Sequence, residues 1–289
     1  MNLAAFEAFV KVMEMGSISL AADQLFITQP AVTKRIHSIE EYFNVSLFES
    51  AGRGIQPTPV AQELLPKVKS WLNELGDIHH NLSHQHQTVQ GSLKLGTSHH
   101  IGLHHLPSYL KNYVQTYPQV SLDVKFVDSE QAHEHVLNGD LSIAFLTLPP
   151  HLDERLSYIA MWEDPLVFVA APFHPLAKMK NLTLSQLLLH TGLLPAAKTY
   201  TSQITLAEFE KHGLRPKFSM STNPLESIRM LTSIGLGWSV LPKTLINQDL
   251  KPLDIDIELK RTLGMVWHPG RSQSKAAETL IQFVQAGNI

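Results

Sequence analysis

Strand-like and helical segments alternate over residues 91–289, and this alternation constrains the fold more than any other feature of the chain. Apolar runs typical of strands fall at 93–97, 122–127, 141–147, 166–171, 217–220, 238–241 and 264–267. Helical patterns fall near 100–117, 130–139, 184–190, 202–212, 224–233 and 274–286. Such alternation predicts an α/β region with parallel strands and right-handed crossovers. The region is large for one core, and the apolar run at 164–176 with a return strand at Arg261 predicts two lobes joined by two crossings.

The N-terminal segment has a different pattern, in which three short helices follow one another closely. Apolar residues recur every three or four positions in the first helix, which Gly16 is expected to end. Ser17 is a candidate N-cap for a second helix at 18–25, and a third begins near Thr28, where Pro30 suits a first turn. The short turn between the last two helices predicts a helix-turn-helix. Two short apolar runs around a Gly-Arg-Gly tip at 47–58 predict a small hairpin, or wing.

A heptad pattern comes next. Its apolar residues are spaced alternately by three and four positions: Ala61, Leu64, Val68, Trp71, Leu75, Ile78 and Leu82. This spacing is typical of a coiled-coil seam and predicts a helix that pairs with a second helix. The alternative is one long helix that lies on the core of its own domain. Trp71 is bulky for a parallel two-stranded seam and favours an antiparallel pairing.

Composition excludes several classes of protein. The 289 residues contain no cysteine, which excludes a disulfide scaffold, a thiolate zinc site, an iron–sulfur cluster and a thiol nucleophile. No apolar run approaches the roughly 18–20 residues needed to cross a bilayer, and the first residues do not resemble a signal peptide, so a cytoplasmic protein is expected. The sequence has no G-x-S-x-G, H-E-x-x-H, P-loop or dinucleotide fingerprint, so no enzyme is predicted.

The N-terminal residues also match a known pattern in register. The matching positions are Leu3, Phe6, Phe9, Gly16, Ser17, Ile18, Ala21, Ala22, Leu25, Thr28, Gln29, Pro30, Ala31, Val32, Thr33, Ile36, Ile39, Glu40, Leu47, Phe48, Arg53 and Thr58. With them the chain resembles the LysR-type transcriptional regulators. The segment Gly235–Pro242 and the pair Leu106 and Pro107 resemble that family's effector domain. The departures are Asn44, Pro57 and Ala61, which replace a usual glycine, leucine and glycine, and Ser50, which replaces an arginine and removes one expected phosphate contact.

The resemblance implies a three-part organisation with an α/β fold overall. A winged helix-turn-helix DNA-binding domain is expected at 1–58 and a linker and dimerisation helix at 59–90. An effector-binding domain of the type 2 periplasmic-binding-protein fold is expected at 91–289, with lobe I at 91–162 and 263–289 and lobe II at 163–262. The implied partners are promoter DNA, a second copy of the chain as homodimer or homotetramer, RNA polymerase and a small-molecule co-inducer, with no other cofactor and no membrane.

A recognition helix places its N-terminal side chains against base edges in the major groove. The candidate DNA contacts are Ser17, Thr28, Gln29, Pro30, Thr33 and Lys34, with Arg53 at the wing tip in the minor groove. For Ser17 and Thr28, simple capping of a helix is the alternative. Residues 1–58 hold four basic and six acidic side chains, so bulk attraction to DNA is weak. Useful affinity is therefore expected to need several DNA-binding heads on one oligomer.

The effector site is expected between the lobes, at strand ends and helix starts. The candidates are Thr97, Ser98, His99, His100, Thr147, Thr201 and Ser202. Hydroxyls and free N–H groups at helix starts favour an anion or a carboxylate. Capping of helices by the Ser and Thr residues is the alternative.

Sixteen histidines raise the question of a metal site. His100 and His104 lie four positions apart, as do His80 and His84, while His133 and His135 flank Glu134. A metal needs three or four converging ligands, and these pairs lie on different elements, so solvated histidines and no metal site are expected. A metal-responsive repressor is one alternative function, which metal titration tests. A solute-binding protein is the other, against which the helix-turn-helix counts.

Overall fold

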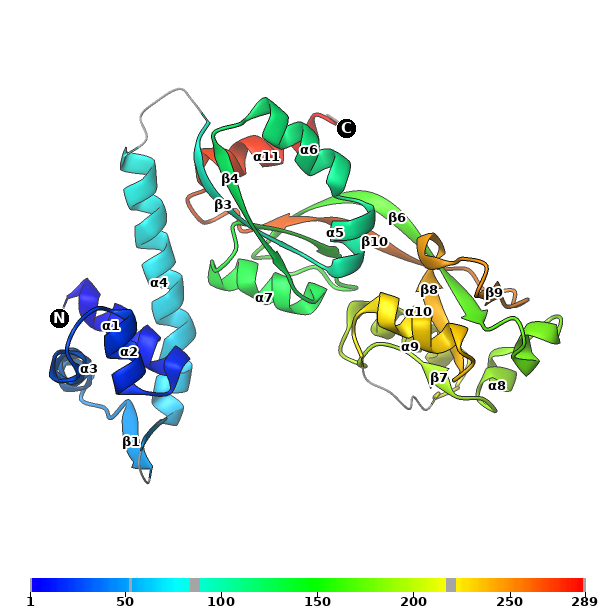
Figure 1. Cartoon of the computed structure of the whole chain (residues 1–289), viewed down its shortest axis with the longest axis horizontal. Coiled ribbons are helices and arrows are strands. Elements are labelled where there is room, and N and C mark those ends of the chain that lie inside the picture. Colours follow the sequence, from blue (N-terminus) through cyan, green and yellow to red (C-terminus); the bar gives the residue numbers. More distant parts are fainter. Residues whose placement is uncertain (1, 52–53, 84–88, 217–221, 288–289) are drawn as a thin grey trace. The chain divides into compact units, whose positions relative to one another are not determined.

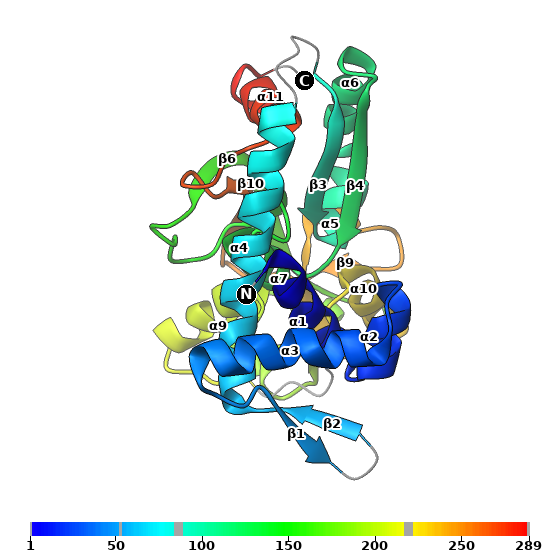
Figure 2. The same cartoon turned by 90° about the vertical axis from the view of Figure 1, so that its left-hand side faces the viewer.

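The computed structural model describes residues 2–51, 54–83, 89–216 and 222–287. The chain forms two compact units, one mainly of Met1–Gln87 and one mainly of Thr88–Leu137 with Leu141–Ile289. Figures 1 and 2 show both units in two views. Arg53 and the strand expected at 217–220 lie outside the described residues.

The N-terminal unit confirms the three short helices and the wing. The helices are α1 (Leu3–Met15), α2 (Ile18–Gln24) and α3 (Gln29–Phe43), and the hairpin is β1 (Phe48–Ala51) with β2 (Gly54–Pro57), paired antiparallel. Gly16 ends α1 in the left-handed region, with φ of 62°. Asn44 ends α3 in the same region, with φ of 51°, and asparagine adopts this conformation more readily than most residues. The asparagine therefore does what the family's usual glycine would do. The hairpin projects away from the helices (Figure 2).

The heptad region forms a single helix, α4 (Pro59–Ser83), whose first half packs onto its own unit. Ala61 is 0% exposed and Val68 is 5% exposed, both in one core with Phe9 of α1 and Ile39 of α3. This burial corrects the prediction for these two positions, because a side chain already covered by its own domain cannot pair with a partner helix. Leu64 is partly buried against the same core. The seam is thus divided, and the alternative of a helix on its own core holds for its first half.

The second unit is built on one mixed sheet with the strand order β4-β3-β5-β10-β6-β8-β7, and β9 pairs with β6. The strands are β3 (Gly91–Thr97), β4 (Val120–Phe126), β5 (Ile143–Thr147), β6 (Ser157–Ala170), β7 (Gly192–Leu193), β8 (Trp238–Pro242), β9 (Lys251–Pro252) and β10 (Leu259–Trp267). The helices are α5 (His99–His104), α6 (Pro107–Thr116), α7 (Ser129–Asn138), α8 (Leu184–Leu187), α9 (Tyr200–Lys211), α10 (Leu225–Ser233) and α11 (Lys275–Gln285). Two short 3₁₀ turns, η1 (Pro175–Lys178) and η2 (Lys243–Leu245), complete the unit.

The two expected crossings are β6 and β10, which run side by side from the first lobe into the second (Figure 1). They pair antiparallel because the chain crosses once in each direction. For the same reason β10 is antiparallel to β5, and β6 to β8, while the outer pairs β3–β4, β3–β5 and β7–β8 are parallel. The prediction of parallel strands was therefore wrong for the centre of the sheet and correct for its flanks.

Each lobe has its own core. In the first lobe, α6 and α11 pack on one face of the strands and α7 lies on the other (Figure 1). In the second, Phe168, Phe209 and Trp238 form the aromatic centre of the core. The single helix expected at 100–117 is divided into α5 and α6. Pro107 is the reason, because a proline has no N–H to donate and suits only the first turn of a new helix.

Candidate functional site

The start of α3 presents the predicted DNA contacts to solvent. Gln29, Pro30, Thr33 and Lys34 are exposed, and Thr28 before them is exposed too. The side chains on the opposite side of the helix are buried in the core of the unit: Val32, Ile36 and Ile39. The helix is therefore amphipathic, and its polar face at the N-terminal end is free of contacts that would bury it.

The capping alternative separates Ser17 from Thr28. Ser17 caps α2, since its Oγ accepts a hydrogen bond from the Leu20 N–H at 3.4 Å. Thr28 occupies the N-cap position of α3 but makes no side-chain capping bond. The Thr33 hydroxyl donates to the Gln29 carbonyl at 3.1 Å, one turn earlier. Capping thus accounts for Ser17 and leaves the Thr28 hydroxyl without that role.

Some of the acidic residues in this segment have structural partners. Glu40 Oε1 accepts a hydrogen bond from the Leu47 N–H at 2.7 Å, which fixes the start of the wing. Glu14 lies 2.9 Å from both Lys11 and Lys69. Burial raises the pKa of Glu14, but the hydrogen bonds from the two lysines outweigh it and hold the pKa below its usual value. Lys69 comes from α4, so the Glu14 carboxylate joins the helix-turn-helix to the helix that follows it.

Phe26 is an exposed aromatic residue that the sequence reasoning missed. It lies in the turn between α2 and α3, with a φ of 54° and a side chain that is 94% exposed. A large apolar side chain at such exposure, in a left-handed conformation, is uncommon in a turn. Nothing in the periodicity identified it, because an apolar residue near helix ends is normally read as core.

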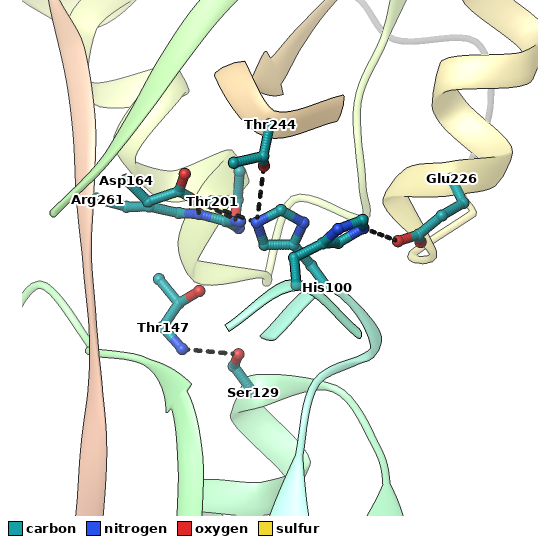
Figure 3. A network of polar contacts seen from close by, with 9 residues as sticks. His100, Ser129, Thr147, Asp164, Thr201, Glu226, Thr244 and Arg261 are labelled. Atoms are coloured by element: carbon teal, nitrogen blue, oxygen red, sulfur yellow. Dashed lines mark hydrogen bonds and ion pairs between the residues drawn. The ribbon is translucent and has the colours of Figure 1, made fainter. Parts of the chain in front are cut away.

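The cleft between the two lobes of the second unit contains a small cavity of about 50 Å³. Five of the seven predicted effector residues line it: Ser98, His99, His100, Thr147 and Thr201. Figure 3 shows His100, Thr147 and Thr201 among them. Ser98 precedes α5 without making a side-chain capping bond. The lining comes from β5, α5, α7, α9, α10 and β10, so segments far apart in the sequence meet here.

Thr97 and Ser202 do not line this cavity. The Thr97 hydroxyl is buried and donates to the Ser98 carbonyl at 3.2 Å. The Ser202 hydroxyl is buried and donates to the Pro195 carbonyl at 2.8 Å, while Thr199 and not Ser202 caps α9. These hydrogen bonds hold both hydroxyls inside their lobes, and an effector contact of Thr97 or Ser202 stays a prediction.

The cavity holds charged residues that the sequence did not single out. Asp128 and Glu130 line it together with Arg261, and Asp164 lies against Arg261. Burial raises the pKa of Glu130, although the N–H of Tyr200 donates to its Oε1. The cavity and its immediate surroundings thus hold three carboxyl groups and one guanidinium, a balance of charge that a strand-to-helix pattern cannot reveal.

A buried polar network joins the lobes through the two crossing strands (Figure 3). Arg261 on β10 donates from Nε to Asp164 Oδ2 on β6 at 2.8 Å and from Nη1 to Thr201 Oγ1 on α9 at 2.7 Å. His100 Nε2 of the first lobe lies 3.4 Å from Asp164 Oδ2 and 3.5 Å from the hydroxyl of Thr244 in the second. Burial lowers the pKa of His100 despite the contact with Asp164. Burial alone would raise the pKa of Asp164, but His100 and Arg261 hold it below its usual value.

Two more hydrogen bonds hold the lobes together at the cavity. Asp128 accepts one from the side-chain amide of Asn223, and Glu130 accepts one from the N–H of Tyr200. Outside this closure lies a groove of about 550 Å³ that shares His99, Asp128, Asn223 and Pro224 with the inner cavity. The bond between Asp128 and Asn223 therefore stands between the groove and the cavity.

Two regions of the chain match families of known function. Residues 3–62 match the description "Bacterial regulatory helix-turn-helix protein, lysR family", and residues 86–288 match "LysR substrate binding domain". The chain belongs to the LysR family. The second match alone covers more than half of the chain, and the first coincides with α1 to α3, the wing and the start of α4.

This LysR-family chain is similar, over nearly its full length, to proteins that are named as transcriptional regulators. The chain is 29% identical to the uncharacterised HTH-type transcriptional regulator YybE of Bacillus subtilis, covering 96% of each. It is 27% identical to the HTH-type transcriptional activator CmpR of Synechocystis, covering 99% of this chain and 95% of that one.

Solved structures of full-length regulators share the fold. CbnR in complex with its target DNA superposes with a TM-score of 0.70 at 16% identity, covering 99% of both chains. A variant of full-length OxyR from Pseudomonas aeruginosa gives 0.68 at 19% identity, covering 98% of this chain and 97% of that one. In the described ranges, no helix combines the length and apolar character needed to cross a membrane.

Proposed function

We propose that this LysR-family chain binds promoter DNA as an oligomer and changes its regulation of transcription when a small polar effector enters the cleft between its lobes. It acts in the cytoplasm, on double-stranded DNA and RNA polymerase. The observation that carries the proposal is the cleft itself: a cavity lined by polar groups of both lobes and closed by two hydrogen bonds between them. A ligand that replaces those bonds shifts the relative population of open and closed lobes.

The DNA-binding part of the proposal rests on the exposed start of α3. Gln29 and Thr33 face solvent and carry the amide and hydroxyl groups that read base edges in a major groove. Pro30 and the exposed Phe26 give apolar contact beside them, and Thr28 and Lys34 give phosphate contacts. Ser17 contributes through the helix terminus that it caps, and Arg53 at the wing tip remains a proposed minor-groove contact.

The oligomer is proposed to form through the second half of the α4 seam. Ala61 and Val68 are excluded by their burial, and Leu64 is partly covered by its own core. Trp71 packs edge-on against Phe6 and still keeps an exposed face. Leu75, Ile78 and Leu82 continue the heptad spacing toward the end of the helix. We therefore assign the pairing to Trp71 and to these three positions.

For the effector, the charge of the cavity argues against the anion expected from the sequence. Asp128, Glu130 and Asp164 stand against a single guanidinium that Asp164 already pairs with. An anionic ligand would meet net negative charge in a site of low polarisability, which costs several kcal/mol unless a carboxyl is protonated. A neutral polyol or a small amine that donates hydrogen bonds to Asp128 and Glu130 suits the lining better. Ser98 and Thr147 are placed to complete its hydrogen bonds.

A thermal-shift comparison tests the site and the ligand class together. The wild-type chain and Asp128→Asn are screened against small organic acids and inorganic anions, and against polyols and amines of the same size. We expect stabilisation by members of the second group, reduced in Asp128→Asn. If only acids stabilise the wild type, and stabilise Asp128→Asn more strongly, the effector is an anion, as the sequence led us to expect. Stabilisation that is the same in the variant would move the effector away from this cleft.

A further inference from the structure

A second polar cluster lies beside the cleft, on the side of His100 away from Arg261. His104 Nε2 in the first lobe lies 3.8 Å from Glu226 Oε1 on α10 of the second lobe, and the rings of His100 and His104 are 5.1 Å apart. One ligand atom from each of His100, His104 and Glu226 can be chosen so that all three lie within 4.8 Å of one another. The carboxylate is the group that sequence reasoning could not connect to the histidine pair.

Two buried polar atoms of this cluster have no hydrogen-bond partner among the described residues, and they are the strongest evidence that it binds something. His100 is 3% exposed, and its Nδ1 has no hydrogen-bond partner among the described residues. Glu226 Oε1 is buried and equally without a hydrogen-bond partner among them. A buried acceptor left unsatisfied costs about 1–3 kcal/mol, so two of them at one place call for an explanation. A cation between them would satisfy both.

The other nitrogen of His100 is already arranged for this role. Its Nε2 faces Asp164 Oδ2 at 3.4 Å, and Asp164 is fixed in turn by Arg261. Histidines that bind metals commonly donate their second N–H to a carboxylate, which sets the tautomer and leaves the first nitrogen free for the metal. With Nε2 protonated toward Asp164, Nδ1 carries the lone pair toward the cluster. Figure 3 shows His100 between Asp164 on one side and Glu226 on the other.

From this geometry we propose that His100, His104 and Glu226 form a site for a divalent transition-metal ion, Zn²⁺ being the best match, that joins the two lobes. Two imidazoles and one carboxylate are a ligand set that zinc accepts, with a fourth position left for water or another small ligand. Ligand atoms in a tetrahedral zinc site lie about 3.4 Å apart, so the cluster must contract by roughly 1 Å. His104 and Glu226 are each about one third exposed and can rotate to do so.

A competing set, His100, His105 and Asp164, is less suitable. Its atoms also lie within 4.8 Å of one another. Asp164, however, is 2.8 Å from both Nε and Nη2 of Arg261, so a second cation on that carboxylate would face a buried guanidinium. Within the described parts of the chain, the ion-pair contact of Glu226 is with His104 at 3.8 Å, and a histidine binds a metal once it is neutral.

The test is metal binding by the full-length protein, stripped with chelator and titrated with Zn²⁺ by calorimetry. We expect one tight site per chain, weakened roughly 10- to 100-fold or more by His104→Gln and by Glu226→Gln. His212→Gln and Glu208→Gln are the matched controls, because His212 Nδ1 and Glu208 Oε1 form a pair at the same 3.8 Å that belongs to neither three-residue cluster. The proposal is overturned if the His104 and Glu226 variants bind as the wild type does, or if the control variants lose as much affinity.

A gain-of-signal variant covers the case in which a loss of binding reflects damage to the fold. Glu226→Cys introduces the first thiol into a chain that has none. With Co²⁺ in place of Zn²⁺, a thiolate ligand adds an intense near-ultraviolet charge-transfer band to the cobalt spectrum. Appearance of this band, lost again when His104→Gln is combined with it, supports the site. A cobalt spectrum identical to that of the wild type would sink it, whatever the protein's DNA binding or effector response.

Discussion

Arg261 and Asp164 face each other directly across the two strands that connect the lobes, joined by a 2.8 Å hydrogen bond, with 4% and 1% of their surfaces exposed. The pair stands where the chain passes from one lobe to the other, and Thr201 and His100 attach a helix of each lobe to it. Its position makes it the connection between lobe geometry and the cavity.

We expect Arg261→Met to destabilise the effector domain by about 3–5 kcal/mol, because it leaves the Asp164 carboxylate buried without its cation. Arg261→Met combined with Asp164→Leu is expected to recover much of that loss, since neither charge then remains. Chemical denaturation of the effector domain measures both. If the single and double variants are equally destabilised, the unpaired Asp164 carboxylate is not the cause of the lost stability.

Glu130 is expected to make the stability of the folded protein depend on pH. Burial raises its folded-state pKa above the unfolded value, so the folded state binds the proton more tightly. Its contribution to stability is full below the unfolded pKa, near 4.5, and is lost as the pH rises through the folded pKa. Glu130→Gln retains an oxygen for the Tyr200 N–H and never ionises. Its melting temperature should exceed that of the wild type above the folded pKa, and the difference should vanish as the pH falls toward 4.5. A difference independent of pH would contradict this.

The exposed start of α3 gives a prediction about sequence specificity. Gln29→Ala and Thr33→Ala should each lower the preference for the operator over unrelated DNA by about 1–3 kcal/mol, with little effect on folding, because neither side chain is buried. Lys34→Ala should weaken binding to all sequences alike and reduce its salt dependence. Fluorescence anisotropy with operator and scrambled duplexes separates the two effects. If both the Gln29 and the Thr33 variant keep the wild-type preference for the operator, other side chains must read its base sequence.

Because the first half of the α4 seam is buried in its own unit, substitutions in its two halves should have different effects. One should destabilise the fold and the other should dissociate the oligomer. Val68→Glu places a charge in the core of the N-terminal unit and should destabilise it by about 3–5 kcal/mol. Leu75→Glu with Ile78→Glu should instead leave the fold intact and dissociate the oligomer. Circular dichroism and sedimentation velocity read the two outcomes. An intact oligomer in the double variant would show that pairing uses another surface.

Phe26 offers a simple control on the recognition surface. At 94% exposure its side chain adds little to stability, so Phe26→Ala should leave the free energy of unfolding within about 0.5 kcal/mol of the wild type. We expect weaker DNA binding nevertheless, because the apolar surface beside the first turn of α3 is removed. DNA binding at the wild-type level would leave this exposed aromatic without a role in the interface.

Local patterns in the sequence determined much of this protein. The three N-terminal helices, their ends at Gly16 and Ser17, the wing, the two crossings and most helices of the lobes follow from periodicity, caps and turn residues, whose effects reach only a few positions along the chain. The same patterns carried the resemblance to the LysR family. They also placed Ser98, His100 and Thr201 at the cleft, since strand ends and helix starts meet there.

Only the tertiary structure decided what these residues touch. The heptad spacing of α4 is the same whether a partner helix or its own domain covers it, and burial of Ala61 and Val68 settled the first half for the domain. Contacts such as those of Arg261 with Asp164 and of His104 with Glu226 join residues far apart in the chain. No periodicity encodes such encounters, because they arise from the packing of whole lobes. The sign of charge in the cavity, and the histidine–carboxylate cluster beside it, are consequences of that packing.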